Sequence, residues 1–267
     1  MLPKISYLIC ATPRCGGYLL FESLENTGLA GIPGEYFWDD KKWGEKWGAT
    51  DYTDFLNKVV EKGTTPNGVF GTKLMWGYFD RFISKVRQTP QFMNSEMTSN
   101  EVLNTLYPNL HFIWIMRRDK VRQAISLWKG LQTVVWWKRI GDPEPKLDKE
   151  PEYNYEAIDY LAQEIMFHEA AWQEYFSQYS ITPFTVIYED LVLKYEETAF
   201  NVMDWLGIDY PDNLKFGERR LLKQADEISE IWVERYIKEK QEQENNRENH
   251  SPFPNASWNY GTSHGNN

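Results

Sequence analysis

The turn at residues 11–18, Ala-Thr-Pro-Arg-Cys-Gly-Gly-Tyr, places one arginine beside two adjacent glycines. The first N–H groups of a helix have no intrahelical partners, and glycine lets a ligand approach the backbone closely. If a helix starts at this turn, its N-terminus and the guanidinium of Arg14 form a cradle for phosphate or sulfate oxygens. An ordinary strand-to-helix turn with a solvated Arg14 is the alternative, and the Gly-Lys-Ser/Thr ending of a Walker A loop is missing.

The flanking residues predict the two elements that this cradle needs. Residues 5–10 form an apolar run typical of a short buried strand, and apolar residues at positions 20, 21 and 24 follow at helical spacing. Cys15 falls at the expected helix start beside Arg14, and both features stabilise a thiolate. We therefore expect Cys15 to be a reactive thiol that a ligand bound at this turn protects, and Cys10 to be buried and slow to react.

A second candidate anion site follows residues 111–116, which form the clearest apolar run of a buried strand. Arg117 comes directly after this strand, and Ser126 lies nine residues further on, in the helix predicted from Lys120. Since ligands gather at the carboxyl ends of parallel strands, Arg117 and Ser126 can meet one phosphate there. A solvated helix face is the alternative, and either Arg117 or its neighbour Arg118 can point inward.

A carboxylate among aromatic residues is the third candidate. Glu35 lies in the segment Gly-Glu-Tyr-Phe at 34–37, where its aromatic neighbours can partly desolvate it and favour a general base. A surface loop carboxylate is the alternative. Lys73 lies near the end of a second apolar strand at 68–76, so it is either a ligand-side residue or an exposed edge residue.

Strand and helix patterns alternate along the chain. Apolar runs predict strands at 5–10, 68–76, 111–116 and 183–187, and helical spacing predicts the main helices at 78–87, 99–106, 155–178, 195–206 and 221–241. Residues 39–50 and 138–154 are expected to be loops. We predict an α/β fold of three α/β/α layers around a mainly parallel sheet, in one domain at 1–241. Residues 242–267 are expected to form a polar, mobile tail.

Composition argues against several classes of partner. With 29 Lys and Arg against 39 Asp and Glu, the net charge is −10, which disfavours binding to nucleic acid or to an anionic membrane. The sequence has no apolar stretch of the roughly 20 residues that span a bilayer, no signal-peptide pattern and no metal-ligand spacing. We therefore expect a cytoplasmic protein without a metal. Aromatic residues make up 16 %, with 12 Trp, and these supply core mass or line a sugar-binding pocket.

Two phosphate sites at strand ends suit a ligand with two phosphate-like groups, and the ordered motifs resemble those of sulfotransferases that use 3′-phosphoadenosine 5′-phosphosulfate (PAPS). Within that group the chain is most similar to the bacterial trehalose 2-sulfotransferase family. The matching segments are Ala11–Gly16 with Leu19–Leu20, Gly34–Phe37, Pro66–Val69 with Lys73–Trp76, Arg117 with Gln123–Trp128, Tyr188–Leu191, and Gln224–Asp226 with Trp232, Val233, Arg235 and Tyr236.

The resemblance implies a P-loop-like sulfotransferase fold, PAPS as donor, 3′-phosphoadenosine 5′-phosphate (PAP) as product, and no metal. It assigns the 3′-phosphate to Arg117 and Ser126, and it makes Glu35 the catalytic base. It assigns the 5′-phosphosulfate and stabilisation of its departing oxygens to Arg14, with the turn residues Thr12, Pro13, Cys15, Gly16, Gly17 and Tyr18. The acceptor it implies is a hydroxyl of a carbohydrate or glycolipid, and a homodimer is one option for the oligomeric state.

The chain departs from the family pattern at a few positions. Cys15, Gly17 and Tyr18 stand where the family has hydroxyl residues, and Ile228 stands where a relative has arginine. Two alternatives therefore stay open. A nucleotide kinase-like P-loop enzyme would depend on Mg²⁺, although the turn lacks the Lys-Ser/Thr pair. A catalytically silent nucleotide-binding protein also fits the altered turn, and a transfer assay with many acceptors separates it from an enzyme.

Overall fold

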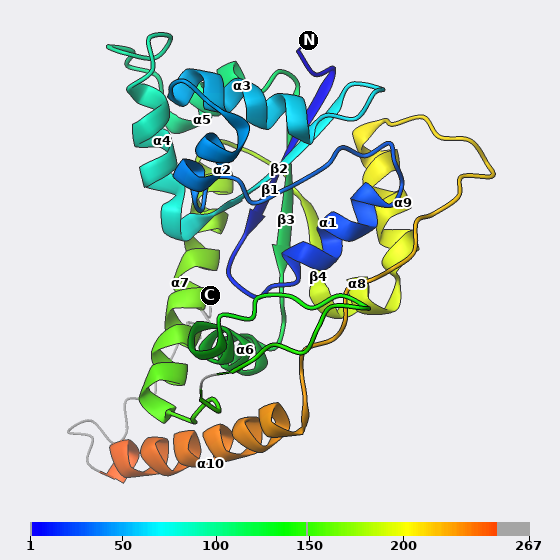
Figure 1. Ribbon diagram of the computed structural model, residues 1–267. Helices are drawn as coiled ribbons and strands as arrows, with labels where there is room; N and C mark the ends of the chain where they lie inside the picture. The colour runs from blue at the N-terminus through cyan, green and yellow to red at the C-terminus, as the bar shows by residue number, and fades with distance from the viewer. Residues whose placement is uncertain (1, 148, 250–267) are drawn as a thin grey trace, which may run out of the picture.

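A four-stranded parallel sheet forms the centre of the molecule (Figure 1). The computed structural model describes residues 2–147 and 149–249. The strand order is β2-β1-β3-β4, with β1 at Ile5–Ala11, β2 at Val69–Met75, β3 at Leu110–Met116 and β4 at Phe184–Ile187. In this register Cys10 of β1 lies beside Leu74 of β2 and Trp114 of β3. The chain segments that follow β1, β2 and β3 therefore leave the sheet at one edge, as the sequence predicts.

Helices cover both faces of this sheet, because alternate side chains of each strand point to opposite sides. Leu8 and Cys10 pack in a core with α3 (Tyr52–Gly63), α4 (Phe79–Arg87), α5 (Ser99–Leu106) and α7 (Tyr155–Gln178). Tyr7, Ile9 and Ala11 pack in a second core with α1 (Gly17–Glu25), α8 (Tyr188–Leu193) and α9 (Tyr195–Leu206). A 3₁₀ turn, η1 (Trp76–Tyr78), connects β2 to α4. The predicted α/β fold with three layers is confirmed.

A third apolar cluster lies beyond the carboxyl edge of the sheet. It joins α6 (Lys120–Thr133), the first half of α7 and α10 (Glu227–Asn249), with Ile125, Ile158 and Trp232 at its centre. Figure 1 shows α10 lying across the lower ends of α6 and α7. This cluster fixes α6, which carries Ser126, against the rest of the domain.

The last helix is displaced from its predicted position at 221–241. It begins at Glu227 because Asp226 caps its first turn, accepting a hydrogen bond from the Ser229 N–H at 3.0 Å. It runs on to Asn249, although apolar spacing ends near residue 241. A solvated helix needs no apolar stripe when spaced charges support it, as Lys238 and Glu242 do at 4.0 Å. The rest of the predicted tail, 250–267, lies outside the described residues.

The expectation of a loop at 39–50 is wrong. Helix α2 occupies Asp40–Trp47, and Asp39 caps it by accepting from the Lys42 N–H at 3.1 Å. Trp43 and Trp47, one helical turn apart, both lie against Tyr36 with ring centroids 5.6 and 5.2 Å away. The helix is therefore stabilised by its cap and by one aromatic face, which outweigh the low helix propensity of Gly44.

Two irregular segments pair with each other close to α1. Residues 134–147 and 149–154 follow α6, and residues 207–226 connect α9 to α10 (Figure 1). The two segments pair in antiparallel fashion, with the Ile140 N–H donating to Arg220 O at 2.8 Å and the Leu222 N–H donating to Lys138 O at 2.9 Å. Buried Glu22 of α1 accepts from the Arg220 N–H at 3.0 Å and so fixes this crossing to the helix.

Candidate functional site

The turn between β1 and α1 has the geometry of an open anion cradle. Gly16 has φ +95°, and a Cβ placed there would lie 2.3 Å from the Tyr188 ring, so only glycine fits. Helix α1 starts at the next residue with no side-chain cap and no acidic residue in its first turn. Its first N–H groups and the positive end of its dipole are therefore available to an anion.

Arg14 lies beside this helix start and its guanidinium contacts neutral oxygens. Nε donates to Ser126 Oγ at 2.9 Å, Nη2 donates to Gln224 Oε1 at 2.5 Å, and Nη1 donates to Trp136 O. Burial, and after it the charge of Arg117, lowers the pKa of Arg14. Among the described residues no carboxylate forms an ion pair with Arg14, so this site keeps a positive charge without a protein counter-ion.

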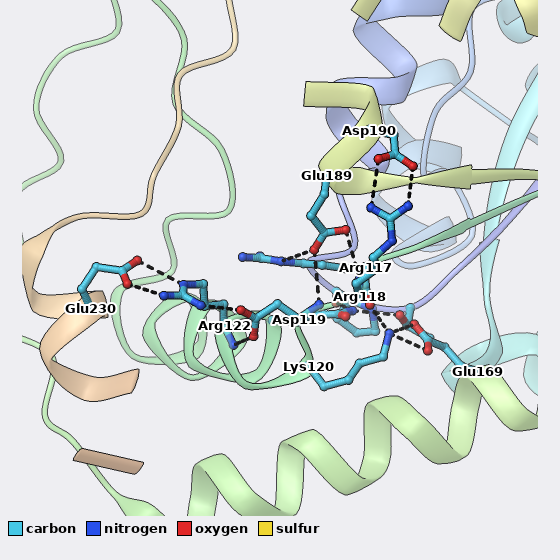
Figure 2. A network of polar contacts seen from close by, with 12 residues as sticks. Arg117, Arg118, Asp119, Lys120, Arg122, Glu169, Glu189, Asp190 and Glu230 are labelled. Carbon is cyan, nitrogen blue, oxygen red and sulfur yellow. Dashed lines mark hydrogen bonds and ion pairs between the residues drawn. The ribbon is translucent and has the colours of Figure 1, made fainter. Parts of the chain in front are cut away.

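Arg117 is the inward member of the tandem arginines. Its side chain is 12 % exposed, its guanidinium lies 4.8 Å from the Tyr188 ring centroid, and its Nε is 4.0 Å from Glu189 Oε1. Within the described part of the chain, this buried Nε has no hydrogen-bond partner. Arg118 instead donates to both oxygens of exposed Asp190, at 2.9 and 2.6 Å, as Figure 2 shows. A buried guanidinium with unused hydrogen-bonding capacity is suited to an incoming anion.

Buried polar side chains hold the turn between β1 and α1 in place, and the sequence did not predict these contacts. Gln123 Nε2 donates to Thr12 Oγ1 at 3.0 Å and to Pro13 O at 2.7 Å. Trp172 Nε1 donates to Ala11 O at 3.1 Å. Thr12, predicted to bind cofactor, therefore has its hydroxyl engaged inside the protein, where it positions the turn. The residue that could have indicated this support is Gln123, because its amide side chain lies on the buried face of α6.

Two further side chains connect the Arg117 segment to the turn. Lys120 Nζ donates to Glu169 Oε1 at 2.7 Å and to Arg117 O (Figure 2). Glu169, on α7, also interacts with Thr12. The two predicted anion-binding segments are thus held by one polar network rather than by independent supports.

Glu35 forms a buried ion pair with Lys73. Lys73 Nζ lies 2.6 Å from Glu35 Oε2, and the two side chains are 4 % and 9 % exposed. The Tyr78 hydroxyl donates to Glu35 Oε1 at 3.3 Å. Burial, and after it the Glu35 carboxylate, raises the pKa of Tyr18. Lys73 is buried, so the alternative of an exposed edge residue is wrong, although β2 is an edge strand of the sheet.

The environment of Cys15 corrects a prediction. Cys15 is 1 % exposed and packs in the core between the sheet and α1. Burial raises the pKa of its thiol, although the charge of Lys73 opposes this effect. The expected reactive thiolate is therefore wrong, because desolvation exceeds the helix-start effect on which the expectation rested.

Two exposed indoles pack on the tyrosines that interact with the Glu35 carboxylate, Tyr18 and Tyr78. Trp137 packs on Tyr18 with ring centroids 4.9 Å apart, and Trp38 lies 6.2 Å from Tyr78. Trp38 and Trp137 are both largely open to solvent, whereas Tyr78 is buried. Aromatic faces beside a buried carboxylate form a suitable surface for the apolar faces of sugar rings.

The order of these motifs matches a known family. The family model described as Stf0 sulphotransferase matches residues 6–239. The chain belongs to the Stf0 sulphotransferase family. Its relatives include a trehalose 2-sulfotransferase of Mycolicibacterium smegmatis, 30 % identical over 88 % of this chain and 96 % of that protein. A trehalose 2-sulfotransferase of Mycobacterium tuberculosis is 29 % identical over 86 % of this chain and 93 % of that protein. The predicted family and the predicted sulfotransferase class are confirmed.

A sulfotransferase domain from the Synechococcus PCC 7002 olefin synthase is similar in structure, with TM-score 0.36 and 17 % identity over 85 % of this chain and 82 % of that one. This likeness is too distant to bear on the chemistry of the Stf0 site. Among residues 2–147 and 149–249, no helix is long and apolar enough to cross a membrane. The same residues contain no group of three or more His, Cys, Asp or Glu side chains placed to hold a metal ion.

Proposed function

We propose that this sulfotransferase moves a sulfuryl group from PAPS to a hydroxyl of a carbohydrate, with Glu35 as the general base. One observation carries the proposal. Arg14 and Arg117 are largely buried close to one another, without strong carboxylate partners, beside the open N-terminus of α1. Two guanidinium groups that repel each other at this depth need an anion of high charge to balance them.

The residues present fit the two anionic ends of PAPS. The N–H groups at the start of α1 and Arg14 would hold the 5′-phosphosulfate, which supplies the activated sulfuryl group. Arg117 would hold the 3′-phosphate, since its buried Nε has a hydrogen bond to donate. Ser126, through its bond to Arg14, lies where the two anion sites adjoin.

In the proposed reaction the residues of this chain act on charge and on one proton. Glu35 accepts the proton of the acceptor hydroxyl as that oxygen bonds to sulfur. Arg14 and the N-terminus of α1 stabilise the negative charge that grows on the departing phosphate. Glu35 is well placed for its role because Lys73 and Tyr78 fix its two oxygens in one orientation.

The carbohydrate acceptor is supported by the site and by the relatives together. Both curated relatives carry the name trehalose 2-sulfotransferase. Trp38 and Trp137 provide exposed aromatic faces next to the tyrosines that contact Glu35, and such faces stack on sugar rings. We therefore propose a small carbohydrate, or the sugar portion of a glycolipid, as the acceptor class.

Calorimetric titration of PAP and 5′-AMP, with and without Mg²⁺, tests the donor assignment. We expect PAP to bind more tightly than 5′-AMP without Mg²⁺, because only PAP has the 3′-phosphate for Arg117. A kinase-like enzyme would instead favour ATP with Mg²⁺. Transfer of ³⁵S from labelled PAPS to a carbohydrate panel that includes trehalose then separates an enzyme from a silent nucleotide-binding protein.

A further inference from the structure

Lys73 lies between the proposed base and the start of α1. On one side its Nζ contacts Glu35 Oε2 at 2.6 Å. On the other side, a Cβ placed on Gly17, the first residue of α1, would lie 3.3 Å from Lys73 Cδ and 3.5 Å from Nζ. The positive charge of Lys73 also acts on the Cys15 thiol in the turn. One ammonium group therefore faces both the carboxylate and the anion cradle.

The surroundings of this ammonium exclude water, so its charge acts strongly on groups close to it. The side chain is 4 % exposed, and Nζ lies 5.0 Å from the Tyr18 ring centroid and 5.3 Å from that of Phe21. Coulombic interactions are stronger where water is excluded. Loss of the negative charge on Glu35 would leave Lys73 as an uncompensated buried cation, which is strongly unfavourable unless another anion is near. The start of α1 at Gly17 lies beside this ammonium and offers a place for such an anion.

We propose that Lys73 couples proton transfer at Glu35 to stabilisation of the leaving group in the cradle. This inference rests on the proposed function. Before the reaction, the Glu35 carboxylate neutralises the ammonium of Lys73. When Glu35 takes the hydroxyl proton, its charge disappears, and the ammonium then acts on the phosphate oxygen that gains charge at the start of α1. The backbone N–H of Lys73 donates to Gly34 O at 3.0 Å, which holds the two segments in register.

The atoms and charges of this step balance without a further reactant. A bond forms between the acceptor oxygen and sulfur, and the bond between sulfur and the bridging oxygen breaks. The acceptor proton goes to a Glu35 oxygen, and the electron pair of the broken bond stays on the 5′-phosphate. Lys73 remains protonated throughout, so one negative charge disappears at Glu35 as one appears in the cradle.

The sharpest test measures PAP binding to a variant that cannot carry the negative charge. Glu35→Gln imitates the protonated carboxyl group and frees Lys73 to act on the cradle. We expect this variant to bind PAP about tenfold more tightly than the wild type, because a charge-assisted contact to phosphate is gained. The double variant Glu35→Gln/Lys73→Met should lose this gain, whereas Glu35→Gln/Lys73→Arg, which keeps the cation, should retain most of it. Isothermal titration gives the affinities, and circular dichroism checks that each variant is folded.

A matched pair elsewhere in the chain provides the control. Lys85 Nζ lies 2.6 Å from Asp40 Oδ2, the same distance as in the Lys73–Glu35 pair, but it contacts α2 rather than the cradle. Asp40→Asn should therefore leave PAP affinity unchanged. Equal PAP affinity in the wild type and Glu35→Gln would overturn the coupling by Lys73, as would a gain that persists in Glu35→Gln/Lys73→Met. If the wild type binds no PAP, the proposed function itself fails, which is a different result.

Discussion

Arg14 Nε donates a 2.9 Å hydrogen bond to Ser126 Oγ and so joins two positions that lie 112 residues apart in the chain. The family resemblance implies different phosphates for these residues, the 5′ end of the donor for Arg14 and the 3′ end for Ser126. Their contact means that the two candidate anion sites adjoin, with Ser126 supporting the guanidinium of Arg14. A change at Ser126 should therefore act through the orientation of Arg14.

Ser126→Ala tests this contact. The variant loses one hydrogen bond to a charged group that keeps two other acceptors, so PAP binding should weaken by about 1 kcal/mol. Thr133→Ala on the same helix is the control, because the Thr133 hydroxyl donates to Lys129 O and does not contact Arg14. Isothermal titration of both variants measures the difference. Equal losses in the two variants would show that Ser126 acts only through the stability of α6.

Arg117→Ala should remove most of the preference for PAP over 5′-AMP. The expected cost is about 1.5–3 kcal/mol of PAP binding, since a charge-assisted hydrogen bond to the 3′-phosphate is lost. Binding of 5′-AMP should change much less. Arg118→Ala is the matched control, because its guanidinium is bound to exposed Asp190 outside the site. If Arg118→Ala rather than Arg117→Ala removes the preference, the inward and outward arginines are assigned the wrong way round.

Gly16→Ala should unfold the turn rather than merely strain it. A Cβ would lie 2.3 Å from the Tyr188 ring, in addition to the strain of a positive φ. Gly48→Ala separates the two effects, because Gly48 also has positive φ but no atom within 4 Å of the added Cβ. We expect a loss of about 1 kcal/mol in the free energy of unfolding for Gly48→Ala. For Gly16→Ala we expect a clearly larger loss, of about 3 kcal/mol or more. Urea unfolding measures both losses in the free energy of unfolding. Equal losses would show that the contact with Tyr188 adds nothing to the cost of the substitution.

Cys15 should be unreactive in the folded protein. Burial raises the pKa of its thiol, so at neutral pH the sulfur is both protonated and inaccessible. Iodoacetamide should label it only as fast as the chain opens, whether or not PAP is present. If Cys15 of the native protein is labelled rapidly and PAP blocks this labelling, the turn is open at Cys15 and this prediction is wrong.

The raised thiol pKa of Cys15 also has a consequence for stability. The unfolded chain loses the thiol proton at a lower pH than the folded chain does, so the folded state binds more protons in that interval. The contribution of Cys15 is fully present below the unfolded pKa, near 9.0, and is lost as pH rises above it. Urea unfolding between pH 7 and pH 10 should show a smaller decline for Cys15→Ala than for the wild type.

The sheet and its main helices could be predicted because their signals are local. The apolar run at 111–116 and the helical spacing at 155–178 each depend only on burial along one element, and both elements appear with nearly those bounds. Helix α2 was missed because Trp43 and Trp47 are stabilised by Tyr36, a contact between separate segments. The end of α10 was missed because a solvated helix does not need the apolar spacing that served as the guide.

The site could be predicted in part, for the same physical reason. Arg14, Glu35 and Arg117 stand at strand ends or beside glycines, where the sequence itself indicates a ligand. The partner of Glu35 could not be predicted, because only the pairing of β2 with β1 brings Lys73 to the start of α1. Gln224 lies in a segment that resembles the family, but its contact with Arg14 could not be predicted, since the two residues are 210 positions apart.

Single-turnover sulfuryl transfer tests most directly whether Glu35 takes the acceptor proton. Single-turnover transfer of ³⁵S from labelled PAPS to a carbohydrate acceptor is compared between the wild type and Glu35→Gln at saturating PAPS. We predict transfer by the wild type and a rate about 10²–10⁴-fold lower in Glu35→Gln, although this variant binds PAP at least as tightly as the wild type does. A Glu35→Gln variant that transfers the label at the wild-type rate would contradict it.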